Sequence, residues 1–159
     1  MDEIINKNVQ KIQDVLYGYG IATKIMQFDV STRTAQDAAN AVGCTIGQIA
    51  KSLIFCTQQT HKAILVLTSG ANRVNETVIE ELVGEKIKKA DADFVRIVTG
   101  FAIGGVPPFG HVQKMITFID EDLLQYEDIW AAAGTPHSVF CLSPQELIKT
   151  TQGVVARIQ

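Results

Sequence analysis

The first pattern along the chain is helical. Between Glu3 and Tyr19, apolar side chains recur at intervals of three and four residues, which predicts an amphipathic helix. Glycine favours helix ends, so we expect this helix to stop at Gly18 or Gly20 and to pack its apolar face on the core. The next segment, residues 21–28, is β-prone and predicts a strand.

Further helices are predicted from their capping residues. A Ser, Thr, Asp or Asn side chain can accept a hydrogen bond from the first turn, and a glycine tolerates the left-handed backbone that follows the last turn. These signals predict helices over residues 35–42, 76–82, 92–98 and 144–149, with N-caps Thr34, Asn75, Asp91 and Ser143 and, for the first three, the terminal glycines Gly43, Gly84 and Gly100. The start at Ser143 is the most complete, because Pro144 and Glu146 add a first-turn proline and a capping box.

The sheet is predicted from short β-prone runs. A helical turn at residues 46–49 leads into KSLIFCT, and AILVLT follows across QQTHK, so these two runs are expected to pair as core strands. Further strands are expected in MITFID, DIWAAA and HSVFCL. Because helices and strands mix without a regular βαβ rhythm, the sequence predicts an α+β fold with a curved, mostly antiparallel or mixed sheet.

Length and composition predict one domain spanning residues 1–159, since 47% hydrophobic content is enough for a core. No apolar run approaches the roughly 20 residues that cross a bilayer, and the N-terminus is polar with mixed charge, so we expect a cytoplasmic protein without membrane contact. Cys44, Cys56 and Cys141 lie far apart in apolar segments, which favours reduced, buried thiols over disulfides or a zinc site.

The net charge of −3 argues against a broad basic face for nucleic acid, so DNA is not an expected partner and any RNA must be held locally. The KIKK run at residues 86–89 is more typical of a solvated face than of an RNA contact. The chain lacks the GxSxG, GxxxxGK[ST], HExxH and strand-linked GxGxxG motifs. The histidines, His61, His111 and His137, are too scattered for a metal site, and no cofactor is expected.

Two features remain as candidates for chemistry. Lys51 lies at the entry to a core strand, where an ammonium group loses solvent, although a lysine there can also extend to water. The segment FAIGGVPPFGH, residues 101–111, must be a loop with a fixed path. Its glycines would let main-chain N–H groups approach an oxyanion or phosphate while Pro107 and Pro108 stiffen it, and the alternative is a structural turn.

Three further residues have two interpretations each. His137, at the start of a predicted strand, could orient a hydroxyl or ester, or it could cap the strand end. Arg73 could face a phosphate or only solvent. Trp130 is expected in the core rather than at an interface, because large aromatic side chains are mostly buried.

Five segments in order and spacing resemble the YbaK/EbsC family of aminoacyl-tRNA deacylases: TRTAQDAANAVG, IAKSLIF, LVLTSGANRV, TGFAIGGVPPFGH and WAAAGTPHSVFCLSPQEL. The resemblance runs from about Thr32 to Gly153. It implies a barrel-like mixed sheet surrounded by helices. It also implies hydrolysis of the ester between a wrong amino acid and the 3′ end of a tRNA, most often the tRNA for proline.

The resemblance also implies the site. The family's functional lysine corresponds to Lys51 and its glycine loop to residues 104–108, so the implied catalytic residues are Lys51, Gly104, Gly105 and His137. The implied substrate-binding residues are Ser52, Ser69, Gly70, Arg73, Thr99, Gly100, Pro107, Pro108, Gly110, His111 and Gly134. Ser52 and His137 are expected to tune which amino acid is accepted, with alanine, cysteine, serine, threonine and 2-aminobutyrate all open.

The expected partners are an aminoacylated tRNA and, as in related proteins, prolyl-tRNA synthetase. We expect main-chain N–H groups of residues 104–110 to polarise the ester carbonyl, and Lys51 to bind the developing negative charge or the terminal phosphate. Water, or a hydroxyl or thiol of the substrate, would attack. The alternative is a binding module on the same fold that senses aminoacyl-tRNA or a nucleotide without turnover.

Overall fold

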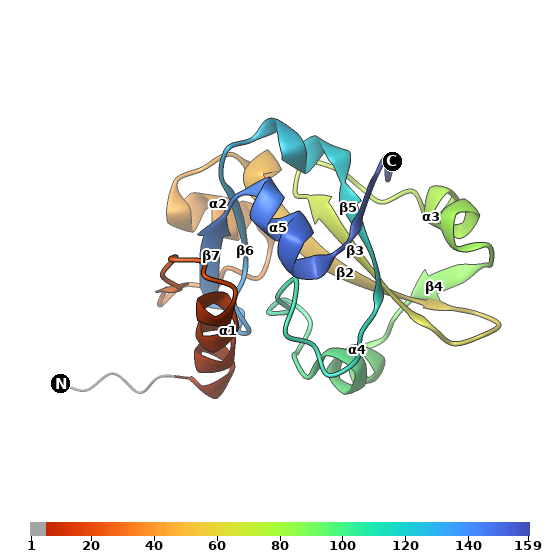
Figure 1. Ribbon diagram of the computed structural model, residues 1–159, viewed down its shortest axis with the longest axis horizontal. Coiled ribbons are helices and arrows are strands. Elements are labelled where there is room, and N and C mark those ends of the chain that lie inside the picture. The colour runs from red at the N-terminus through yellow and green to blue at the C-terminus, as the bar shows by residue number, and fades with distance from the viewer. Residues whose placement is uncertain (1–5) are drawn as a thin grey trace.

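A mixed β-sheet with helices on both faces forms the molecule, and the computed structural model describes residues 6–159 (Figure 1). The helices are α1 Lys7–Gly18, α2 Ala35–Val42, α3 Glu76–Val83, α4 Ala92–Thr99 and α5 Pro144–Thr151, with short 3₁₀ turns η1 Ile46–Gln48 and η2 Glu121–Gln125. The strands are β1 Met26–Gln27, β2 Ile49–Thr57, β3 Ala63–Ser69, β4 Ile87–Lys89, β5 Ile116–Asp120, β6 Ile129–Ala132, β7 Ser138–Leu142 and β8 Val154–Ala156.

The strand order is β1-β7-β6-β2-β3-β5-β8, with β4 paired to β2 outside this path. The predicted α+β class and mixed sheet are confirmed. The sheet is not a closed barrel, however, because its end strands β1 and β8 each pair with one neighbour and not with each other. The expected mixed sheet surrounded by helices is therefore confirmed, but the sheet does not close into a barrel.

Strand β2 changes partner along one of its edges. On one side it pairs antiparallel with β3 from Ala50 to Cys56. On the other side it pairs in parallel with β6 only at Ile49 and Ala50, and then antiparallel with β4 from Phe55 to Thr57. Residues 51–54 therefore have no ladder partner on this second edge.

Alternation along β2 separates the core into two faces. Ala50 and Ile54 belong to the large cluster that includes buried side chains of α1, α4 and α5. Phe55 and Ile49 lie on the opposite face, in smaller clusters beneath α3 and α2 respectively. Figure 1 shows the corresponding arrangement, with α5 in front of the sheet and α3 beside β4 at the right.

The capping residues act as predicted. The side chains of Thr34, Asn75, Asp91 and Ser143 accept hydrogen bonds from first-turn N–H groups, and the Ser143–Glu146 capping box is present. Gly43, Gly84 and Gly100 follow their helices with left-handed backbones. Helix α1 is also confirmed, although the first positions of its predicted range, residues 3–5, lie outside the described residues.

The short elements differ from the predictions. Only Met26 and Gln27 of the predicted strand 21–28 are in a strand, because β1 meets only two residues of β7. β4 and β8 were not expected, since three residues are too few to show an alternation.

Lys88 and Lys89 of the KIKK run are exposed, as expected for a solvated face. None of the helices within residues 6–159 has the length and apolar character that crossing a membrane demands.

Candidate functional site

A cavity of about 250 Å³ opens where β2 has no ladder partner on its second edge. Four stretches of chain form its wall: the start of α2 with the residues before it, β2, the 101–111 loop and the facing parts of β6 and β7. The residues that line it are Thr32, Arg33, Thr34, Ala35, Ala38, Ile49, Ala50, Lys51, Ser52, Leu53, Ile103, Gly104, Val106, Trp130, Ala131, Ala132 and Val139. The structure thus brings Lys51, Ser52 and Gly104 of the predicted site into one cavity.

Lys51 and Arg33 provide the positive charge of this cavity. Lys51 is half-buried on β2, and Arg33 extends from the segment before α2. The one salt bridge within residues 6–159 joins Lys86 to Glu80, so neither cation has a carboxylate within 4.0 Å there. Two cations in a cavity wall without acidic partners favour an anionic ligand.

The backbone around Lys51 is fixed by a second layer of buried polar contacts. The Ser69 hydroxyl donates to the Gly47 carbonyl at 2.7 Å, and the Gly70 N–H donates to the Ile49 carbonyl at 2.8 Å. Gly70 must lack a side chain, because a Cβ there would lie 2.5 Å from the Ile46 carbonyl oxygen. The structure therefore places Ser69 and Gly70 behind the cavity, where they hold the turn that leads into β2.

Gly104 and Gly105 of the predicted catalytic loop occupy different positions. Gly104 lines the cavity with φ +93°, and a Cβ there would lie 2.5 Å from Cγ of Arg33. Gly105 packs against the backbone of Thr135, and its N–H donates to the Ala102 carbonyl at 3.0 Å. The cavity-lining loop residues whose N–H groups have no acceptor within the described chain are Ile103, Gly104 and Val106.

His137 is exposed and does not line the cavity. Its ring Nδ1 lies 3.1 Å from the Val30 carbonyl, and its own carbonyl accepts from the Phe28 N–H at 2.8 Å. The neighbouring Pro136 carbonyl accepts from the Thr32 N–H at 2.7 Å. These contacts tie the 134–137 turn to the segment that carries Arg33. These contacts match the second interpretation of His137, in which it caps the end of the strand.

The other predicted binding residues do not line the cavity. Thr99 and Gly100 end α4, where the Thr99 hydroxyl accepts from the Phe101 N–H. Arg73 is exposed before α3. The Gly134 carbonyl accepts from Asn8 of α1 at 3.2 Å. Pro108, Gly110 and His111 line a separate hollow of about 520 Å³, and Pro107 is buried.

His111 holds the far end of the glycine loop. Its Nε2 lies 2.6 Å from the Pro107 carbonyl, which closes a short turn around the Pro-Pro pair. Burial lowers the pKa of this imidazole below its usual 6.5, and the Lys11 charge adds to that effect, while the Pro107 carbonyl opposes it. A neutral ring at pH 7 can still donate to this carbonyl, so His111 supports the loop path.

The cysteines are free and lie outside the cavity. Cys56 is buried as expected, whereas Cys44 and Cys141 are only partly buried. Burial, together with the nearby Asp128 and Glu146 carboxylates, raises the pKa of the Cys141 thiol to about 11. Burial also raises the pKa of Cys44. Both thiols are thus protonated at neutral pH, which disfavours a cysteine nucleophile.

Sequence reasoning missed two side chains of the cavity. Arg33 stands within TRTAQ, and its position directly before a helix cap was the available signal. Trp130 was expected in the core, yet it is half-buried and lines the cavity while packing against the cluster under α2. Both depend on α2 and β6 meeting beside β2, which no local pattern reveals.

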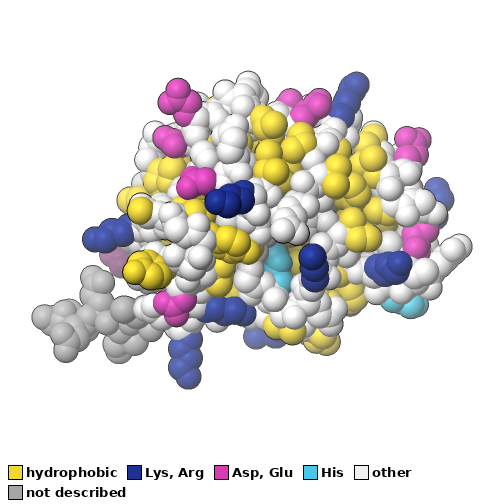
Figure 2. Space-filling model, in the orientation of Figure 1, with side chains coloured by type: hydrophobic (Ala, Val, Ile, Leu, Met, Phe, Trp, Pro, Cys, Tyr) yellow, Lys and Arg dark blue, Asp and Glu magenta, His cyan; other side chains and the backbone are white. Residues whose placement is uncertain are grey.

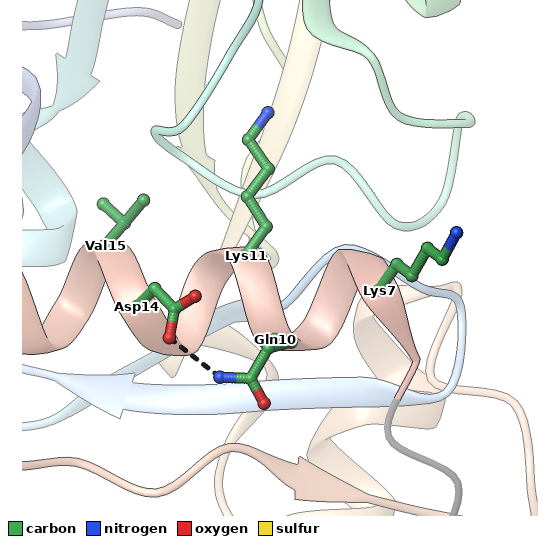
Figure 3. Close-up of a pocket in the computed structure, with 5 residues that line it drawn as sticks. All are labelled: Lys7, Gln10, Lys11, Asp14 and Val15. Atoms are coloured by element: carbon green, nitrogen blue, oxygen red, sulfur yellow. Dashed lines mark hydrogen bonds between the residues drawn. The ribbon is translucent and has the colours of Figure 1, made fainter.

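Another hollow lies elsewhere, along one side of α1 (Figure 3). Its volume is about 580 Å³, and Lys7, Gln10, Lys11, Asp14 and Val15 line it. All five come from one helix, and Gln10 bonds Asp14 at 2.8 Å on that same surface. Because no second element converges on this hollow, it lacks the enclosed, multi-sided shape of a small-molecule site.

Charge on the surface is mixed rather than gathered. Figure 2 shows basic and acidic side chains interspersed over the face that it presents. This distribution agrees with the net charge of −3 and with the expectation that any RNA is held locally. The Lys51 cavity is one place where two basic side chains, Lys51 and Arg33, lie in the same wall.

Comparisons with known proteins identify the family of this chain. The model of the aminoacyl-tRNA editing domain matches residues 29–150. An uncharacterised protein of Bacillus subtilis (strain 168), YwhH, is 29% identical over 77% of this chain and 78% of its own length. A proline–tRNA ligase of Thermoanaerobacter sp. (strain X514) is 28% identical over 65% of this chain, a match that spans only 18% of the ligase.

A solved structure is similar over nearly the whole chain. Described as a proposed trans-editing enzyme for prolyl tRNA synthetase, it has a TM-score of 0.91 and 41% identity, covering 98% of this chain and 99% of that one. The family match includes every residue that lines the Lys51 cavity. The chain belongs to the aminoacyl-tRNA editing domain family.

Proposed function

We propose that this protein hydrolyses the ester of a mischarged aminoacyl-tRNA, with tRNA for proline carrying a small wrong amino acid as the substrate. The observation that carries the proposal is that Lys51 and Gly104 line the same cavity at the open edge of β2. Membership of the editing family supports the reaction class. Similarity to a proposed trans-editing enzyme and to part of a proline–tRNA ligase supports the choice of tRNA.

The reaction needs little from the protein, because an aminoacyl ester is already an activated acyl group. Water adds to the carbonyl carbon, the bond to the ribose oxygen breaks, and that oxygen takes the proton that the water loses. The intermediate carries an oxyanion, which preorganised donors stabilise strongly in a desolvated site. In this cavity the free N–H groups of Gly104 and Val106 are the proposed donors, and the Lys51 ammonium offsets the charge.

The remaining wall suits the 3′ end of a tRNA. The Arg33 guanidinium, which has no carboxylate of residues 6–159 within 4.0 Å, matches a phosphate, which it can bind through two N–H groups. Trp130 offers a partly exposed indole, and unpaired bases stack on aromatic side chains. We assign Arg33 to the terminal phosphate and Trp130 to the terminal base, which places the ester between them and the glycine loop.

The test is incubation of the purified protein with a panel of mischarged tRNAs for proline, carrying alanine, cysteine, serine, threonine or 2-aminobutyrate. We expect at least one to lose its amino acid much faster than in buffer, while correctly charged prolyl-tRNA is spared. Release is measured by acid-precipitable label. A protein that shifts the mobility of these tRNAs and leaves every ester intact is the binding module instead, and the proposed hydrolysis is then wrong.

Gly104→Ala is expected to lower kcat/KM at least about 10-fold, because a displaced loop or Arg33 misplaces the ester. The added Cβ meets the Arg33 side chain, and the left-handed backbone costs about 1 to 2 kcal/mol for alanine. Gly84→Ala is the matched control, since Gly84 has φ +84° but open space around a Cβ. It should lose similar stability and keep its activity. Equal activity of the two variants contradicts a role for the Gly104 contact.

A further inference from the structure

A second, smaller hollow of about 160 Å³ adjoins the Lys51 cavity. The two share Ser52, Leu53, Ile103 and Val106 in their walls, so they meet along β2. The rest of the second wall is formed by Ile54, Phe55, Ala90, Val95 and one charged residue, Lys89. This hollow is therefore a mainly apolar chamber that opens beside the lysine.

Ser52 stands where the two hollows meet, and its hydroxyl oxygen is buried without a hydrogen-bond partner. Within residues 6–159 it is the sole buried side-chain nitrogen or oxygen in that condition. A buried hydroxyl without a partner is unfavourable, and native proteins contain few of them. A polar group of a ligand, or a water molecule, would complete its hydrogen bonding.

The main chain at Ser52 is also unpaired, toward the second edge of β2. Antiparallel register with β3 points the N–H and C=O groups of alternate β2 residues to the other edge, where the Ile54 carbonyl accepts from the Ala90 N–H. Ser52 shares that orientation, but the β6 ladder stops at Ala50 and the β4 ladder starts at Phe55. A short polar ligand can therefore bond the Ser52 main chain while a side chain enters the chamber.

We propose that the 160 Å³ chamber receives the side chain of the esterified amino acid, and that the Ser52 hydroxyl selects side chains with a hydroxyl or thiol on the β-carbon. This inference rests on the proposed function. An apolar cavity of roughly 150 Å³ holds a benzene molecule, so the chamber is ample for serine, cysteine or threonine. A side chain without the hydroxyl or thiol leaves Ser52 unpaired, which disfavours alanine and 2-aminobutyrate.

Seryl-tRNA and 2-aminobutyryl-tRNA test this directly, because their side chains differ only by O–H against CH₃. With both on tRNA for proline, we expect the wild-type protein to show about a 10- to 100-fold higher kcat/KM for the seryl ester. Ser52→Ala should bring that ratio close to one. Its thermal midpoint should be unchanged or raised, since the wild-type hydroxyl makes no hydrogen bond. Thr23→Ala, which removes a hydroxyl outside both hollows, should keep the wild-type ratio.

The outcomes separate the two proposals. Hydrolysis of both esters at equal rates, or a preference for 2-aminobutyrate, overturns the selection by Ser52 and leaves the deacylase function standing. The same holds if Ser52→Ala keeps the wild-type preference for serine. If the wild-type protein hydrolyses neither of these nor any other mischarged tRNA, the deacylase function itself is overturned.

Discussion

Replacing Lys51 by alanine is expected to reduce deacylation about 100- to 1,000-fold, the usual loss when one preorganised donor to an oxyanion is removed. Lys51 is half-buried in the cavity wall, and no carboxylate of the described chain neutralises its ammonium group. Its charge is therefore free for a substrate. The rate constant is measured in single turnover with the mischarged tRNA that the wild-type protein hydrolyses fastest.

Two control variants accompany this test. Lys88→Ala removes an exposed lysine from β4 that lines neither hollow, and it should keep the wild-type rate. Cys141→Ala should also keep it, because a thiol with a pKa of about 11 is a poor nucleophile at neutral pH. A Lys51→Ala variant that folds and hydrolyses the ester at the normal rate rules out the assigned role of Lys51.

Asp120→Ala is expected to lower the free energy of unfolding by about 3 kcal/mol, since it leaves several buried donors without their charged acceptor. Asp120 is 1% exposed at the end of β5. Its Oδ2 accepts from the Ser69 N–H and the Asn72 amide, both at 2.9 Å, and its Oδ1 accepts from the Asp122 N–H at 2.9 Å. Urea unfolding at constant m value measures the loss.

Asp14→Ala provides the comparison for Asp120. Asp14 is exposed on α1 and accepts one hydrogen bond, from Gln10, so its loss should change stability by less than about 0.5 kcal/mol. Similar stabilities of the two variants would contradict the stabilising role of the Asp120 hydrogen bonds. Because Asp120 holds Ser69, which in turn holds the turn before β2, the folded fraction of Asp120→Ala should also lose activity.

Local signals in the sequence were enough for most helices and for the central strands. Thr34, Asn75, Asp91 and Ser143 act through contacts only two or three residues away, which is why their helices could be read directly. β4 could not, because its exposed lysines give no alternation and it exists only through pairing with β2. The open sheet likewise follows from long-range pairing rather than from any one segment.

Site residues in local motifs could likewise be predicted, whereas those that depend on long-range packing could not. Lys51, Ser52 and Gly104 lie in segments with recognisable motifs and reach one cavity. His137 and Gly105 share those motifs, but their hydrogen bonds are made to Val30 and Ala102, outside the cavity. Arg33, Trp130 and the unpaired hydroxyl of Ser52 become visible only once distant segments are brought together.

The partner change along β2 has a consequence for how such a protein can diversify. β6 runs with β2 and β4 runs against it, so the two strands approach the same edge from opposite ends and neither can continue through the other. Chain connectivity, rather than any wall residue, keeps that opening in place. Under the proposed function, substitutions at Ser52 or Ile103 would change which ligand is recognised and leave the hydrogen-bonded framework of the sheet intact.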